Sequence, residues 1–116
     1  MSLKTPFYYY DLTLLENTLQ AMSNAVSNPN YKVHYAIKAN SEDRILQIMQ
    51  ERGLGADCVS GNEIKKALEI GFAPQDIVFA GIGKTDEELA LAISSGIHSI
   101  NCESIEELEV INENYQ

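Results

Sequence analysis

A short apolar run followed by a helical stretch recurs four times after residue 31, and this repeat restricts the fold more than any other feature of the sequence. Each run is strand-sized and contains β-branched or aromatic residues, and the stretches after it place apolar residues on one helical face. Consecutive strand–helix units imply parallel strands joined by helical crossovers. The sequence therefore predicts an α/β fold with strands near residues 33–37, 56–59, 77–80 and 97–102.

Residues that start and stop helices stand at the expected places in these units. A serine or threonine follows every apolar run, and three of the four carry a glutamate three positions on, which is the capping-box spacing. Glycines lie where three of the helices should end, because a left-handed terminal residue costs glycine little. The predicted starts are Ser41, Ser60, Thr85 and Ser104, the boxes add Glu63, Glu88 and Glu107, and the glycines are Gly53, Gly71 and Gly96.

The length of the repeat indicates a barrel. Units of about 20 to 25 residues are near those of a (β/α)8 TIM barrel, and a complete barrel takes roughly 250 residues. The 116 residues of this chain can hold about four parallel β/α units. We expect residues 31–116 to form the first half of a truncated barrel that stops inside a helix. Residues 1–30 are expected to form an extended segment or strand around 7–11 and a helix over 12–27, which Thr13 with Glu16 would begin.

The first and fourth strands of such a half-barrel would be open edges, with unpaired backbone donors and acceptors. Two copies could pair edge to edge or exchange segments, and either arrangement would cover the exposed backbone. The sequence therefore predicts a homo-oligomer.

Charge and composition exclude several classes of function. The formal net charge is -9, a field that opposes binding to nucleic acid. No apolar run approaches the roughly 20 residues of a membrane span, and residues 1–10 lack the features of a secretory signal, so a cytoplasmic protein is expected. Cys58, Cys102, His34 and His98 do not stand at metal-ligand spacings, and no metal site is predicted.

Lys38 is the candidate catalytic residue. Side chains of a strand alternate between its two faces, so Lys38 should point away from the face that carries Val33 and Ile37. It should also lie at the carboxyl end of its strand, where parallel α/β proteins build their sites. A lysine buried there would lose hydration and favour its neutral form, which can form a Schiff base with an aldehyde. From the pattern alone, a lysine that simply reaches solvent remains the alternative.

Five ordered segments resemble the barrel-type, pyridoxal-phosphate-dependent enzymes related to alanine racemase. Within that group, the Val-Ser-Gly-x-Glu and Gly-x-Gly-Lys-Thr patterns are similar to those of diaminopimelate decarboxylases. Asn62 departs from the decarboxylase pattern, which often has glycine at that position. The segments that carry the resemblance are Thr5–Asp11, Tyr35–Asn40, Gly55–Glu63, Phe79–Thr85 and Asn101–Ser104.

The resemblance implies a pyridoxal 5'-phosphate cofactor held by Lys38 and an amino-acid substrate, meso-2,6-diaminopimelate, which would give L-lysine and carbon dioxide. Asp57 and Glu63 become candidate cofactor-side residues, although helix capping alone accounts for Glu63. The phosphate loop, the acidic partner of the ring nitrogen and the substrate-binding arginine of such enzymes belong to later segments. This chain alone should therefore not complete catalysis. An ornithine- or arginine-type decarboxylase and a non-catalytic half-barrel module remain the alternatives.

The Gly83-Lys84-Thr85 sequence invites comparison with a phosphate-binding P-loop. That motif requires a glycine five positions before its second glycine, and Val78 stands there instead. Nucleotide hydrolysis is therefore not predicted, and Thr85 is interpreted as a helix cap. Glu103, at the end of a predicted strand, is a further residue that could face the site.

Overall fold

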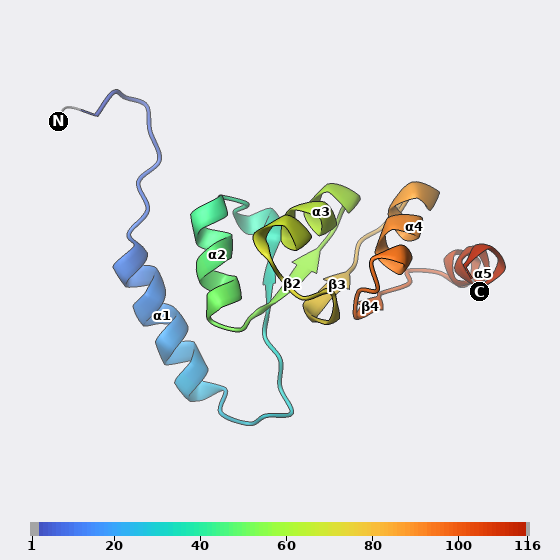
Figure 1. Ribbon diagram of the computed structural model, residues 1–116, viewed down its shortest axis with the longest axis horizontal. Coiled ribbons are helices and arrows are strands. Elements are labelled where there is room, and N and C mark those ends of the chain that lie inside the picture. Colours follow the sequence, from blue (N-terminus) through green and yellow to red (C-terminus); the bar gives the residue numbers. More distant parts are fainter. Residues whose placement is uncertain (1–2, 116) are drawn as a thin grey trace. The chain divides into compact units, whose positions relative to one another are not determined.

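The computed structural model describes residues 3–115, which divide into two compact units, one ending at Tyr31 and the other beginning at Lys32 (Figure 1). The first unit contains helix α1 (Leu12–Ala25), whose first turn is capped by Asp11: the carboxylate accepts a hydrogen bond of 2.9 Å from the Leu14 backbone N–H. The helix therefore starts from Asp11, and the expectation that Thr13 begins it is wrong.

The segment before α1 is extended but has no strand partner among the described residues, so the strand expected over residues 7–11 is not formed. A strand needs a neighbour that satisfies its backbone donors and acceptors. Instead, the rings of Tyr8 and Tyr10 stack on each other with their centroids 6.3 Å apart.

The second unit contains the parallel sheet that the repeat predicts. The strands pair in the order β1-β2-β3-β4, so β1 and β4 are its edges, as expected. A helix follows each strand, and the unit also contains two short 3-10 turns, η1 (Ile37–Ala39) and η2 (Pro74–Asp76). The strands are β1 (His34–Ala36), β2 (Gly55–Cys58), β3 (Ile77–Phe79) and β4 (Ser99–Ile100), and the helices are α2 (Asp43–Glu51), α3 (Gly61–Ile70), α4 (Asp86–Ser94) and α5 (Ile105–Asn114).

The two faces of the sheet differ in burial. On one face, Ala56 pairs in register with Ile77 and Cys58 with Phe79, and all four are fully buried together with apolar residues of α2, α3 and α4. The other face carries the row Ala36, Asp57, Val78 and Ser99, which are all only half-buried. We call this second face the inner face, because in a closed barrel the face turned away from the helices lines the interior.

The helix ends follow the predicted residues in most units. Ser60, Thr85 and Ser104 accept hydrogen bonds from the backbone N–H three residues on. The three predicted glycines close their helices with positive φ angles of 77°, 108° and 66° at Gly53, Gly71 and Gly96.

The predicted capping boxes are complete in only one helix. Thr85 and Glu88 exchange both hydrogen bonds, whereas Glu63 reaches the N–H of Val59 and Glu107 reaches that of Glu103, one residue before each cap. In all three helices the glutamate still satisfies a backbone donor that the helix leaves unpaired.

The predicted start of α2 at Ser41 is wrong. The Asn40 side chain accepts a hydrogen bond of 3.0 Å from the Glu42 N–H and so turns the chain before the helix. The carboxylate of Glu42 then caps α2 by accepting from Arg44 and Ile45. The helix consequently begins one residue later than a cap at Ser41 would place it.

Glu88 joins two helices. One oxygen of its carboxylate accepts a hydrogen bond of 2.8 Å from the Gly61 N–H at the start of α3, and the other accepts one of 3.0 Å from Thr85. These two backbone bonds, that from Gly61 first, lower the pKa of Glu88 below its ordinary value. The fold therefore favours the charged carboxylate.

We expect Glu88→Gln to lower the free energy of unfolding at pH 7 by about 1 kcal/mol, the usual cost of a lost cap. Because the pKa of Glu88 is lowered in the folded chain, its contribution is complete above the ordinary carboxyl pKa and is lost as the pH falls through the lowered value. Urea unfolding at pH 7 and at about pH 3 should show the difference between wild type and variant shrinking in acid. Glu87→Gln, on the exposed side of the same turn, is the matched control. An equal difference at both pH values would contradict this interpretation.

Candidate functional site

All four parallel strands end at the same edge of the sheet, and Lys38 lies at this carboxyl edge directly after β1. The strand is shorter than the sequence predicts: the chain leaves the extended conformation after Ala36, and Lys38 stands in the 3-10 turn η1. The neighbouring Ile37 is fully buried, and the Tyr35 hydroxyl donates a hydrogen bond of 3.2 Å to the Asn40 carbonyl. These two contacts fix the turn that presents Lys38.

The side chain of Lys38 is exposed, so the expectation of a buried, dehydrated amine is wrong for this chain. Within residues 32–115 the inner face of the sheet is only partly covered, since Ala36, Asp57, Val78 and Ser99 are half-buried. Within that same range, no hydrogen bond or ion pair engages the Lys38 amine. Three other lysines are engaged: Lys32 with Asp76, Lys66 with Asp43 and Lys84 with Glu107.

Asp57 lies on the inner face near Lys38. It pairs in register with Ala36, two residues before Lys38, and its side chain is half-buried. The structure thus brings Lys38 and Asp57 to adjacent strands at one edge.

Glu63 has a different environment. Its carboxylate accepts a hydrogen bond of 2.7 Å from the Val59 N–H at the start of α3, so it is engaged in holding the helix end. Its charge and that of Asp57 also add to the effect of burial, which is the main cause that raises the pKa of the Cys58 thiol to about 12. Cys58 is therefore a protonated, packed residue and not a nucleophile.

Lys84 is the residue at this edge that the sequence analysis missed. Its side chain is only 1% exposed, and its ammonium donates to the carbonyls of Gly81 (2.7 Å) and Asn101 (2.8 Å) and to the carboxylate of Glu107 (2.8 Å). The nitrogen also lies 5.6 Å from the centroid of the Phe79 ring. The only local signal was the Gly-x-Gly-Lys-Thr sequence, which says nothing about these distant partners.

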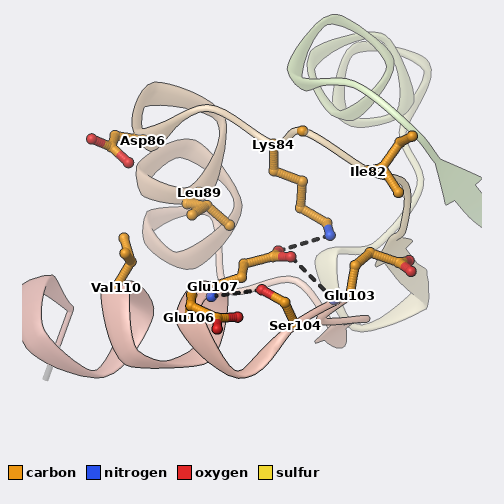
Figure 2. Close-up of a pocket in the computed structure, with 10 residues that line it drawn as sticks. Ile82, Lys84, Asp86, Leu89, Glu103, Ser104, Glu106, Glu107 and Val110 are labelled. Carbon is orange, nitrogen blue, oxygen red and sulfur yellow. Dashed lines mark hydrogen bonds and ion pairs between the residues drawn. The ribbon is translucent and has the colours of Figure 1, made fainter.

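A pocket of about 330 Å³ opens beside Lys84, between the loop that precedes α4 and the first turns of α5 (Figure 2). Acidic side chains form much of its wall, and apolar side chains of both elements complete it. The residues that line it are Ile82, Gly83, Lys84, Asp86, Leu89, Glu103, Ser104, Glu106, Glu107 and Val110.

Comparison with known proteins identifies the family and the fold. Residues 12–116 match the family profile of the pyridoxal-dependent decarboxylases, over the pyridoxal binding domain. The chain belongs to this family. The resemblance inferred from the sequence motifs is thereby confirmed, as is the cofactor that the family implies, pyridoxal phosphate.

Individual relatives of the chain are diaminopimelate decarboxylases. That of Bacteroides thetaiotaomicron is 54% identical over 97% of the chain, and that of Aquifex aeolicus is 40% identical over 94%. The matches cover only 29% and 26% of those two proteins, so the chain spans less than a third of their length.

Solved structures confirm the fold of this part of a barrel decarboxylase. The Helicobacter pylori diaminopimelate decarboxylase, crystallised with L-lysine, matches with a TM-score of 0.91 and 38% identity over 97% of the chain and 28% of its own. The ornithine decarboxylase of Entamoeba histolytica matches with a TM-score of 0.78 and 31% identity, over 87% of this chain and 31% of its own. The α/β prediction, with four parallel strand–helix units, is therefore correct.

The structure also bears on two other features, membrane-spanning helices and metal centres. In the part of the chain that the structure describes, no helix is long and apolar enough to cross a membrane. Within residues 3–115, no group of three or more histidine, cysteine, aspartate or glutamate residues is placed to hold a metal ion.

Proposed function

We propose that this chain is the cofactor-lysine part of a pyridoxal-phosphate-dependent decarboxylase that converts meso-2,6-diaminopimelate to L-lysine and carbon dioxide. The 54% identity to the Bacteroides enzyme supports this substrate over ornithine or arginine, for which the structural relatives are 30–31% identical. The observation that carries the proposal is the place of Lys38, an exposed amine without an ion pair in the described range, at the carboxyl edge of the sheet.

The residues present fit an aldehyde cofactor. An amine that is free of ion pairs is available to an aldehyde. Within residues 3–115 this holds for Lys38, whereas Lys32, Lys66 and Lys84 are paired with carboxylates. Lys38 would hold the cofactor covalently through its amine at the carboxyl edge of the sheet. The bound cofactor supplies the electron sink that accepts the pair released when the substrate carboxylate leaves as carbon dioxide.

We assign Lys38 two tasks and Asp57 one. Lys38 holds the cofactor and, once substrate displaces it, its freed amine can move a proton to the carbon that has lost the carboxylate. Asp57 supplies a negative charge on the same inner face and is the cofactor-side carboxylate. Glu63 acts at the helix start, since its oxygen is already bonded to Val59.

The remaining parts of the proposal concern the whole protein. The relatives are more than three times as long as this chain, and we propose that the missing phosphate- and substrate-binding groups belong to the rest of such a protein. By itself the chain is then inactive. We also retain the homo-oligomeric assembly and the cytoplasmic location as proposals.

A pair of chimeras tests the function. In the diaminopimelate chimera this chain replaces the 113 matching residues of the Bacteroides enzyme, and in the ornithine chimera it replaces the matching part of the Entamoeba enzyme. We expect the first to keep at least about a tenth of the kcat/KM of its parent, and the second to fall by about a hundredfold or more. Activity in the ornithine chimera alone would favour an ornithine-type parent protein, because the chain would then fit the rest of that barrel and not that of the Bacteroides enzyme. Two folded but inactive chimeras would favour a non-catalytic half-barrel.

A further inference from the structure

The Gly-Ile-Gly-Lys-Thr segment, rejected as a nucleotide-binding loop, has a different task in the structure. It brings Lys84 into a buried position where an ammonium with three N–H donors meets three oxygen acceptors. The acceptors come from three elements: Gly81 from the loop after β3, Asn101 from the loop after β4 and Glu107 from α5. Lys84 therefore ties together segments that are 23 residues apart in the chain.

Each of the three N–H donors of the Lys84 ammonium has an acceptor, which explains how a charged group can occupy this buried position. Taking a charged group out of water is unfavourable unless every donor finds a partner and an opposite charge is near. Lys84 meets both conditions, and the face of the Phe79 ring adds a favourable contact with the cation. Among the residues that the structure describes, no buried side-chain nitrogen or oxygen lacks a partner.

Glu107 extends the tie to the backbone after β4. One of its carboxylate oxygens accepts from Lys84, and the other accepts a hydrogen bond of 3.1 Å from the Glu103 N–H (Figure 2). The Ser104 hydroxyl in turn accepts from the Glu107 N–H at 3.1 Å. The Lys84 bond, as the main cause, lowers the pKa of Glu107, so the acceptor stays charged at neutral pH. Without Lys84, the segment would keep the bonds of its own helix start and the hydrogen bond of 2.8 Å that the Asn101 N–H donates to the Phe79 carbonyl.

We propose that Lys84 is a positioning residue of the carboxyl edge, which holds the segment Asn101–Glu103 in one place beside the cofactor site. The location of that site rests on the proposed function, whereas the tie itself rests on the contacts of Lys84. Lys84 touches neither cofactor nor substrate in this account. It acts through Glu107 and through the Asn101 carbonyl, and its buried amine is not a competitor of Lys38 for the aldehyde.

Hydrogen exchange in the chain itself tests the tie. In Lys84→Met the Glu103 N–H should exchange at least about tenfold faster than in wild type, while the Ala80 N–H, bonded to Cys58 in the sheet, should change less than about twofold. Glu107→Gln leaves one acceptor oxygen for the two donors Lys84 and Glu103, so the Glu103 N–H should exchange faster in this variant as well. Lys66→Met, which breaks only an exposed ion pair with Asp43, should leave Glu103 unchanged. Equal acceleration at Glu103 and Ala80 would mean a general loss of stability and would overturn the proposal.

Decarboxylation by the diaminopimelate chimera tests the consequence for the site. At a temperature where near-ultraviolet circular dichroism shows both proteins folded, Lys84→Met should lower kcat/KM about tenfold or more while the cofactor still attaches to Lys38. Glu107→Gln, which can satisfy only one of the donors Lys84 and Glu103, should lower kcat/KM as well. A kcat/KM within about twofold of the unsubstituted chimera would overturn the positioning role, because a residue that only stabilises the fold leaves the folded enzyme's rate unchanged. If the unsubstituted chimera is itself inactive, the proposed function fails. The hydrogen-exchange result then tests only whether Lys84 holds the segment Asn101–Glu103 in place.

Discussion

Lys38→Ala in the diaminopimelate chimera is expected to lower kcat by about 10²- to 10⁴-fold, the range found when a positioned proton-transfer group is removed. The substitution also removes the nitrogen that binds the cofactor aldehyde. It should leave the fold intact, because the Lys38 side chain is exposed and makes no hydrogen bond or ion pair within residues 3–115. Circular dichroism and a steady-state assay of carbon dioxide release check the two halves of this expectation.

Lys66→Ala is the matched control for Lys38. It removes an amine from the second compact unit, which also contains Lys38, but this amine pairs with Asp43 on the surface. Activity should therefore stay within about twofold. A Lys38→Ala chimera that keeps more than a tenth of the activity would show that another amine holds the cofactor.

Gly55→Ala should produce the largest loss of stability. A methyl group at Gly55 would lie 2.3 Å from Cδ2 of His34, 2.5 Å from its Nε2 and 2.6 Å from the Asp76 carbonyl oxygen. The His34 ring can rotate, but the carbonyl belongs to the backbone next to β3 and cannot move without shifting the strand. Overpacking of this kind typically costs about 1–3 kcal/mol, and urea unfolding of the chain measures it.

A double substitution separates the two clashes at Gly55. His34→Ala with Gly55→Ala removes the contact with the ring and leaves that with the Asp76 carbonyl. We expect it to recover part of the lost stability and not all of it. A Gly55→Ala single variant within about 0.5 kcal/mol of wild type would show that the spacing of β2 and β3 is softer than the structure indicates.

The elements that the sequence predicts well are those with local causes. The Thr85–Glu88 capping box forms between residues three apart. Gly71, which ends α3, has a positive φ angle that depends on the backbone of that residue alone. Such features depend on neighbours along the chain and are readable from it. The prediction of a helix start at Ser41 is wrong for an equally local reason, because the Asn40 side chain accepts the hydrogen bond of the Glu42 N–H just before the helix.

The features that the sequence does not predict depend on segments far apart in the chain. Lys84 meets Asn101 and Glu107 only after β3, α4 and β4 have folded, and no spacing rule links these residues. The sequence predicts a buried Lys38, whereas its side chain is exposed. The burial of a residue at the carboxyl edge depends on what lies over the inner face and not on the strand that carries the residue. The resemblance of ordered motifs singles out Lys38, where periodicity alone leaves two interpretations open, and the role of Lys38 stays a prediction.

The location of the cofactor on the chain tests the central claim most directly. The diaminopimelate chimera, loaded with pyridoxal phosphate and reduced with borohydride, would be digested and its peptides weighed by mass spectrometry. We expect the reduced cofactor on the peptide that contains Lys38 and none on the peptide that contains the buried Lys84. A label found mainly on any other lysine, or total labelling unchanged in Lys38→Ala, would contradict the account.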